Sequence, residues 1–378
     1  MDKIKNIKHK LKEFYMLCPM AHTVGIVSAA VIVLHLLTRH NKGLMVKISE
    51  NFVRPYHQTM AELLNSLPFS MAELLIWAAG VSVLAFVIYG SVRIVIEKER
   101  LKRLYKTVLP LAAFALLVYA LFSVFWGTYY YADDFISRSG LKNERISVEQ
   151  LKTVTRYFAD MANEYSEKVT RDENGFYRPD REEILELSPE LYENAEEKFP
   201  CLQGEALKAK PFRFSRILSY TDFTGFFFPF TGEANVNIDF PPNLFPSTVA
   251  HELAHQRGIA KEQEANFAAV LVSLEYGQTD YVYSAALLAY THLGNALYKA
   301  DYEAWKEISG KLGEYVLLDF AENRLYWEKF EGPAQSTMNK VYEGFLQSYD
   351  QKLGLKSYGA CVDLLVNYYY DEALKAVN

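Results

Sequence analysis

Three apolar stretches near the start of this 378-residue chain constrain its fold more than any other feature. A helix needs about 20 apolar residues to cross the hydrocarbon core of a bilayer. The stretches at about 19–37, 71–96 and 108–126 approach or exceed that length, and charged residues flank each of them. Three such stretches so close together disfavour the alternative, in which each is a buried helix of a soluble core. We therefore predict that residues 1–130 form an anchor of three transmembrane helices in the lipid bilayer.

Charge divides the chain at the same place. Residues 1–130 contain 15 Lys/Arg and 7 Asp/Glu, a net charge of +8, and residues 131–378 carry a net charge of −14. A large acidic domain repels phosphate, so no nucleic acid is expected as a partner. The composition instead predicts a water-soluble domain over residues 131–378.

Basic residues also predict the orientation of the anchor. The N-terminal tail has five lysines, and the segment from Arg93 to Lys106 has six basic residues, whereas the longer loop 38–70 has only four. Cytoplasmic loops carry the excess of Lys and Arg. We therefore expect an uncleaved, multi-pass anchor in the cell membrane that places the C-terminal domain on the extracytoplasmic side.

The acidic domain has three regions. Residues 141–200 have helical periodicity, and Phe212 to Ile238 is rich in aromatic and β-branched residues, which predicts two or more strands. Prolines then end the sheet, Ser247-Thr248 is expected to cap the next helix, and the rest is almost entirely helical. The predicted fold class is α+β: three transmembrane helices followed by a mostly helical domain with a small β-sheet.

The most informative motif is His251-Glu252-Leu253-Ala254-His255. Residues four apart lie on one face of an α-helix, so the two imidazoles can hold one Zn²⁺. Glu252 lies one residue around the helix, where it can accept a proton from a metal-bound water without being a ligand. The spacing HExxH therefore predicts a zinc site with Glu252 as the catalytic base.

A third protein ligand is expected for catalytic zinc, and two carboxylates follow the motif. Gly258 permits a tight turn, so a second helix can return antiparallel to the first. Glu262 is then expected beside the second histidine, and Asn266 can hydrogen-bond the outer nitrogen of the first. Glu264 is the competing ligand, and we favour Glu262.

The sequence resembles the gluzincin metallopeptidases in these residues. The segment 262–268 is similar to the E-x-E-A-N/D-x-x-A helix of their membrane-bound and ImmA/IrrE-like members. Further segments resemble a bacterial family of uncharacterised, membrane-anchored HExxH proteins: Leu67 to Ser70, Trp126 to Tyr130, Leu218 to Tyr220 and Pro229 to Asn235. The resemblance implies a zincin-like fold and a bacterial cell-membrane protein, and it carries over His251, Glu252, His255 and the Glu262/Glu264 region. The gap of six residues between His255 and Glu262 is shorter than in typical gluzincins, which leaves the third ligand open.

Zincins place an exposed strand beside the active helix, and a peptide substrate adds to it as another strand. The segment 226–235 is the candidate for that strand, although its aromatic side chains are equally compatible with a plain core. A polar group must also stabilise the oxyanion of the tetrahedral intermediate. The candidates, among which the sequence does not choose, are Tyr281, Tyr283, Tyr290, His292 and Arg257.

Cysteine usage is uninformative about redox chemistry. Cys18, Cys201 and Cys361 form no CxxC pair. A disulfide between Cys201 and Cys361 is compatible with an extracytoplasmic domain, and unpaired thiols are the favoured alternative.

The predicted function is zinc-dependent hydrolysis of peptide bonds by metal-activated water, acting on a peptide or protein substrate. Two alternatives stay open. One is a sensor or scaffold that binds zinc or peptide without turnover, and the other is hydrolysis of a non-peptide amide such as a cell-wall crosslink. The intact Glu252 disfavours the scaffold, because a purely structural site does not need that carboxylate. The sequence does not indicate an oligomeric state.

Overall fold

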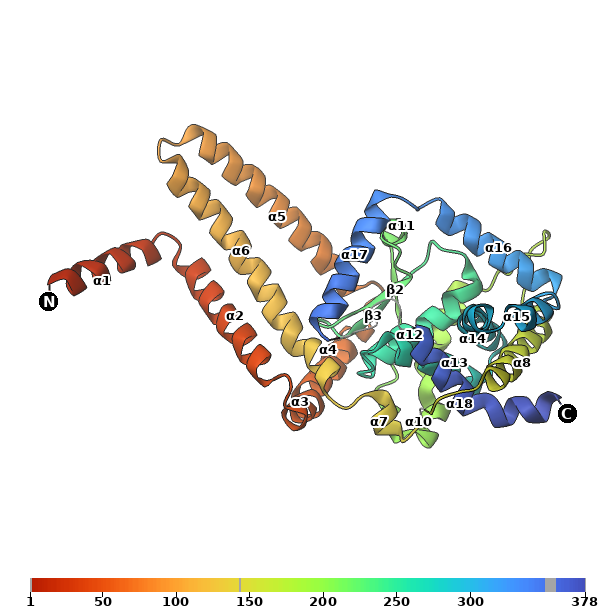
Figure 1. Ribbon diagram of the computed structural model, residues 1–378. Coiled ribbons are helices and arrows are strands. Elements are labelled where there is room, and N and C mark those ends of the chain that lie inside the picture. The colour runs from red at the N-terminus through yellow and green to blue at the C-terminus, as the bar shows by residue number, and fades with distance from the viewer. Residues whose placement is uncertain (1, 143, 351–357, 378) are drawn as a thin grey trace.

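The structure is a computed structural model that describes residues 2–142, 144–350 and 358–377. Figure 1 shows N-terminal helices that project from a compact, largely helical body, which contains a small sheet. The sheet lies close to the place where the projecting helices meet the body. The predicted order of helical region, small sheet and long helical half is confirmed.

Three of the described helices are long and apolar enough to cross a membrane. They are α2 (Pro19–Thr38), α5 (Met71–Ile96) and α6 (Arg100–Phe125). At 1.5 Å per residue, 20 to 26 residues span about 30–39 Å, which matches a bilayer. Helix α6 packs against both α2 and α5, and α5 and α6 form an antiparallel hairpin (Figure 1). The predicted positions of the three apolar helices are confirmed, with α6 beginning earlier, within the basic segment.

The predicted loop 38–70 is helical. It contains α3 (Lys42–Ile48), a π-helical turn (Ser49–Val53) and α4 (Arg54–Asn65), while the N-terminal tail forms α1 (Asp2–Tyr15). Helix α4 packs on the body: the Tyr56 hydroxyl donates to the Phe230 carbonyl at 2.8 Å, and the buried His57 ring lies 5.1 Å from that of Phe227. This connection is therefore part of the body rather than a free loop.

The body is built from helices of very different lengths. Before the sheet lie α7 (Phe135–Ser139), α8 (Val148–Ser166), α9 (Arg181–Leu187) and α10 (Glu193–Lys198), and α11 (Ser215–Tyr220) follows the first strand. After the sheet come α12 (Phe245–Gln256), α13 (Glu262–Tyr276), α14 (Thr279–Ala300), α15 (Tyr302–Ser309), α16 (Glu314–Glu328), α17 (Pro333–Ser348) and α18 (Tyr358–Val377). Helices α8, α13, α14 and α18 pack together around a continuous apolar core.

The sheet has three described strands in the order β1-β3-β2, namely β1 (Lys210–Phe212), β2 (Gly225–Phe228) and β3 (Glu233–Asn237). The central strand β3 is fully buried, runs parallel to β1 and is antiparallel to β2, with Phe226 opposite Asn235. The segment 226–235 is therefore a hairpin rather than one edge strand. Only its first half, β2, lies at the edge of the sheet.

Two carboxylates exchange hydrogen bonds between the sheet and the start of α5. Glu233 of β3 accepts from the backbone N–H groups of Met71 at 3.0 Å and Ala72 at 2.8 Å. In return Glu73 accepts from the backbone N–H groups of Arg213 and Phe214, both at 2.9 Å. Both carboxylates are buried. The first turn of a helix has unpaired N–H groups and a partial positive charge, so the two acids join α5 firmly to the sheet.

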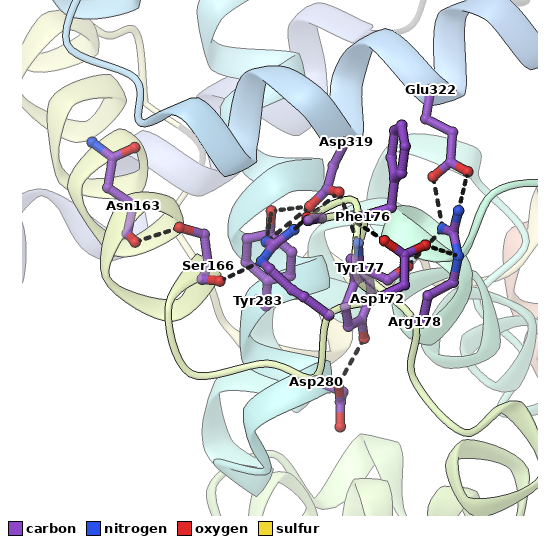
Figure 2. Close-up of polar contacts among 12 residues, drawn as sticks. Asn163, Ser166, Asp172, Phe176, Tyr177, Arg178, Asp280, Tyr283, Asp319 and Glu322 are labelled. Carbon is purple, nitrogen blue, oxygen red and sulfur yellow. Dashed lines mark hydrogen bonds and ion pairs between the residues drawn. The ribbon is translucent and has the colours of Figure 1, made fainter.

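A second polar network fixes the segment that follows α8 (Figure 2). The fully buried Asp319 of α16 accepts from the Tyr283 hydroxyl at 2.6 Å and from the Tyr177 backbone N–H at 3.1 Å. Arg178 forms a bidentate pair with Glu322 at 2.7 and 2.9 Å. The network ties this segment to α14 and α16, on the side of the body away from the membrane helices (Figure 1).

Replacing Glu233 by alanine is expected to loosen the joint between α5 and the sheet. The change leaves two buried N–H groups without an acceptor, which costs about 1–3 kcal/mol. For the 378 residues of this chain that corresponds to a fall in Tm of roughly 1 °C per kcal/mol. Thermal unfolding of the full-length protein in detergent measures this fall, and hydrogen exchange at residues 71 and 72 localises it. Glu205→Ala, an exposed acid in a nearby loop, is the control; equal behaviour of the two variants would refute the role of Glu233.

Candidate metal centre

Helix α12 carries the His251–His255 motif, and it begins before the predicted cap. Pro246 lies in its first turn, and the residue at its N-terminal boundary is Leu244, so the helix starts two residues ahead of Ser247. The Ser247 hydroxyl donates to the Leu244 carbonyl at 3.0 Å instead of accepting from the helix. The predicted cap at Ser247-Thr248 is therefore wrong, because proline at the first helical positions already sets the backbone for the helix.

A glycine turn joins α12 to α13. Gly258 has φ +79°, a left-handed conformation that glycine adopts without strain. Its N–H donates to the His255 carbonyl at 2.9 Å, and the Ile259 N–H donates to the Ala254 carbonyl at 3.1 Å. A Cβ at Gly258 would lie 2.8 Å from the Tyr129 ring, so the position is also too tight for a side chain. The turn returns α13 along α12, as the sequence predicted.

The hairpin brings His251, His255 and Glu262 together. The Oε2 atom of Glu262 lies 3.3 Å from His251 Nε2 and 3.8 Å from His255 Nε2. The three donor atoms lie within 4.8 Å of one another. Two donors bound at 2.0–2.1 Å to one tetrahedral zinc would be about 3.3 Å apart, so the spacing fits such an ion.

The outer nitrogens of both histidines bind oxygen acceptors. His251 Nδ1 lies 3.0 Å from Asn266 Oδ1, and His255 Nδ1 lies 2.6 Å from the Ile259 carbonyl oxygen. A carbonyl oxygen accepts only, so each Nδ1 carries a proton and each Nε2 faces Glu262, where it can donate to the carboxylate when protonated or bind a metal when it is not. Outer partners of this kind fix the tautomer that a metal ligand needs.

The protonation states of His255 and Glu262 depend on each other. Burial disfavours the charged form of His255, but the Glu262 carboxylate outweighs burial and raises the pKa of His255 to about 9. Burial in turn opposes ionisation of Glu262, and the two histidines still hold its pKa well below the usual value. The pocket therefore favours a carboxylate that faces positive charge, which a divalent cation would also supply.

Tyr342 of α17 completes the surroundings of Glu262. Its hydroxyl donates to Glu262 Oε1 at 2.6 Å, while the other oxygen faces the histidines. Tyr342 was missed in the sequence because it lies 80 residues from Glu262 and is one of 27 tyrosines. No local pattern marks it.

Glu264, the competing ligand, points away from the histidines. Its Oε2 accepts from the Phe135 backbone N–H at 2.7 Å, at the start of α7, and its Oε1 lies 3.5 Å from Lys261 Nζ. The side chain is buried, and burial raises the pKa of Glu264 to about 7. The geometry thus assigns Glu264 to holding α7 and leaves Glu262 beside the histidines.

Glu252 is a buried acid next to the histidine pair. It is 4% exposed, and its Oε2 has no hydrogen-bond partner among the described residues. Burial raises its pKa to about 7, with the histidines opposing the shift. A Cβ at Gly225 of β2 would lie 2.7 Å from Glu252 Oε1, so the acid fits only because that residue is glycine. No pattern around Gly225 in the sequence indicates that it lies against Glu252.

None of the five predicted oxyanion candidates lines the cavity that the histidines face, although His292 lies near enough to His251 for that residue's charge to contribute, after burial, to lowering the pKa of His292. Tyr281 donates to the Ile184 carbonyl at 2.7 Å, Tyr283 to Asp319, and Arg257 to the Leu202 carbonyl at 3.0 Å. Tyr290 and His292 lie on α14 and do not line the cavity that the histidines face. The tyrosines that line it within the described chain are Tyr119, Tyr130 and Tyr342.

That cavity has a volume of about 1350 Å³ and contains His251, Glu252, His255 and Glu262 in its lining. Its other surfaces come from α5, α6, α17 and the edge strand β2. The indole of Trp126, directly after α6, packs edge-on to His255 with ring centroids 5.5 Å apart. The end of a predicted membrane helix is therefore part of the site.

The sequence model of one family matches residues 49–366, and its description is a protein of unknown function, DUF3810. The match covers most of α4 to α18 and includes every residue of the candidate centre. No curated protein matches the chain, and neither does any solved structure. These comparisons assign no chemistry to the site.

Proposed function

We propose that this chain, which belongs to the DUF3810 family, is a membrane-anchored zinc metallopeptidase of the zincin type. One observation carries the proposal. The Nε2 atoms of His251 and His255 converge on Glu262 Oε2, directly beside the buried, unpartnered oxygen of Glu252. Two imidazoles, one carboxylate and an adjacent free carboxylate are the set that hydrolysis by activated water requires.

In the proposed reaction, His251, His255 and Glu262 hold zinc. When bound, zinc supplies a Lewis acid and lowers the pKa of a coordinated water. Glu252 accepts the proton of the attacking water and later delivers it to the leaving amine. Asn266 and the Ile259 carbonyl keep both imidazoles in the required tautomer. Tyr342 donates its hydroxyl proton to Glu262 Oε1 and so holds the carboxylate with its other oxygen toward the histidines.

Peptide is the favoured substrate because strand β2 offers a free edge in the same cavity. An extended chain can add to such an edge through main-chain hydrogen bonds.

The second candidate is a zinc- or peptide-binding scaffold without turnover. Glu252 disfavours this candidate. Burying an ionisable group without a hydrogen bond costs free energy of folding, and a scaffold without turnover has no use for that carboxylate. Hydrolysis of a non-peptide amide uses the same residues and differs only in substrate.

The helix directions support a location outside the cytoplasm. Helix α2 runs toward the body, α5 runs away from it and α6 returns (Figure 1). The N-terminal tail and the α5–α6 connection thus lie at one end of the spans, and the body lies at the other. Both segments at the first end are rich in Lys and Arg, which holds them in the cytoplasm. We propose that the body is extracytoplasmic in a bacterial cell membrane.

Removing either histidine is expected to abolish zinc binding. His251→Ala and His255→Ala each delete one of only three protein donors, so the metal content of the full-length protein, measured by mass spectrometry, should fall from about one zinc per chain to near zero. Near-stoichiometric zinc in the double variant would refute the centre.

The third ligand is tested by two neighbouring acids. Glu262→Ala should weaken zinc affinity by more than Asn266→Ala, for which a loss of about 10–100-fold is expected. Glu264→Ala is the matched control, since it removes the same side chain two residues away. Its zinc affinity should stay near that of the wild type while its Tm falls, because the Phe135 N–H loses its acceptor. A larger affinity loss in Glu264→Ala than in Glu262→Ala would assign the ligand to Glu264.

Glu252→Gln should keep zinc and fold but lose hydrolysis by about 10²–10⁴-fold, because the amide cannot accept a proton from water. The assay is a peptide-library digest by full-length protein, with Glu264→Gln as the buried-acid control. Unchanged hydrolysis in Glu252→Gln would overturn the mechanism. A wild type that binds zinc but cleaves no peptide would instead favour the scaffold or the non-peptide amide.

Orientation is tested with an epitope placed after Asn378. Protease added to intact spheroplasts should remove the epitope, because an odd number of spans places it opposite the basic tail. An epitope before Asp2 should stay protected in the same cells. If the C-terminal epitope is protected until the membrane is lysed, the domain faces the cytoplasm.

A further inference from the structure

The cavity at the candidate metal centre continues along a membrane helix. One face of α6 lines it, at the helical spacing i, i+3, i+4, i+7, i+8 and i+11: Leu111, Phe114, Ala115, Val118, Tyr119 and Phe122. Val83 of α5 lies on the opposite arm of the hairpin and contributes to the same cavity. From Leu111 to Trp126 the helix rises about 22 Å. The cavity therefore begins within the segment that is apolar enough to cross a bilayer and ends at the histidines.

The two ends of the cavity differ in chemistry. The end formed by α12, α13 and α17 holds the ionisable groups His251, His255, Glu252 and Glu262. The part formed by α5 and α6 is lined almost entirely by aliphatic and aromatic side chains. A water-soluble peptide has no apolar segment that could pack along this part of the cavity. An occupant with an apolar segment of its own can fill it.

The edge of β2 lies between these two ends. The Thr224 carbonyl accepts from the Asn237 N–H at 2.8 Å, so this pair and the Phe226–Asn235 pair are the hydrogen-bonded pairs of the hairpin. The main-chain groups of the intervening Gly225 and Phe227 consequently face away from β3. Both residues line the cavity. The free edge thus offers backbone donors and acceptors to an extended chain beside Glu252.

We propose that the substrate is a polypeptide with a membrane-embedded apolar segment, which packs along α5 and α6 while its extended flank adds to β2. The inference rests on the proposed peptidase function and names its substrate class. Within lipid a chain must stay helical to satisfy its backbone, so the cleaved bond lies just beyond the embedded segment, where the chain becomes extended at the level of Phe122 and Trp126. A free lipid would use the apolar part but not the strand edge, which favours a polypeptide.

Binding is tested without turnover, in the Glu252→Gln full-length protein in lipid nanodiscs. The probe is a synthetic peptide with a 20-residue Leu/Ala helix followed by a ten-residue extended flank, and the control probe is the flank alone. A photo-reactive residue replaces Val118 within the cavity or Ala85, an exposed residue on α5 that does not line it. We expect the helix-bearing probe to crosslink at position 118 at least about tenfold more than at position 85. Equal yields at both positions would mean general contact in the bilayer and would overturn the proposal. So would crosslinks at position 118 to nanodisc lipid alone.

A cavity-filling pair of variants gives the second measurement. Ala115→Trp places a large ring in the cavity, and Ala85→Trp places the same ring on the outer surface of the hairpin. Ala115→Trp should reduce crosslinking of the helix-bearing probe at position 118 by about tenfold or more, and Ala85→Trp should leave it unchanged.

If the wild-type enzyme cleaves soluble and helix-bearing peptides through Glu252 and Ala115→Trp slows neither, the peptidase function stands and this substrate class is wrong. If the crosslinks form as expected but no peptide is cleaved, the binding proposal stands and the peptidase function fails.

Discussion

Reciprocal hydrogen bonds join α5 to the sheet that borders the candidate site. Glu233 accepts hydrogen bonds from the N–H groups at the start of α5, and Glu73 accepts hydrogen bonds from the N–H groups that follow β1. Because α5 pairs with α6, the joint also fixes the end of α6 and the Trp126 that packs on His255. Two buried acids and four N–H groups therefore join the start of α5 to the sheet that borders the histidines.

The arrangement of the candidate metal centre was predictable because its parts are local. His251, His255, Glu262 and Asn266 span 16 residues on two helices joined by one glycine. Helical periodicity and the length of the turn fix which faces meet, so the choice of Glu262 over Glu264 agrees with the observed geometry. Whether the centre binds zinc stays a prediction. The Ser247-Thr248 cap failed for an equally local reason: Pro246 starts the helix without a side-chain cap.

The remaining parts of the site were not predictable from one sequence, because they come from distant segments. Tyr342, Gly225 and Trp126 reach the centre only through the packing of α17, β2 and α6, and nothing in their own neighbourhoods indicates that they lie beside the histidines. Glu73 interrupts the second apolar stretch close to its start, and the structure shows that it serves as an acceptor for the backbone of the body. Cys18, Cys201 and Cys361 are free thiols, so the disulfide left open by the sequence is not formed. Long-range pairing of this kind depends on the whole topology rather than on periodicity.

The division at residue 130 stays a prediction, but the contacts across it are extensive. Trp126, Tyr129 and Tyr130 are buried with Phe227 of β2 and with Leu346 and Tyr349 at the end of α17. Aromatic side chains bury about 150–250 Å² each, and apolar burial is worth about 25 cal/mol per Å², so these three rings contribute on the order of 10 kcal/mol as an upper estimate. That is comparable to the whole stability of a typical domain. The N-terminal helices are thus a structural component of the candidate site, because Trp126, directly after a helix that is apolar enough to cross a bilayer, packs against His255.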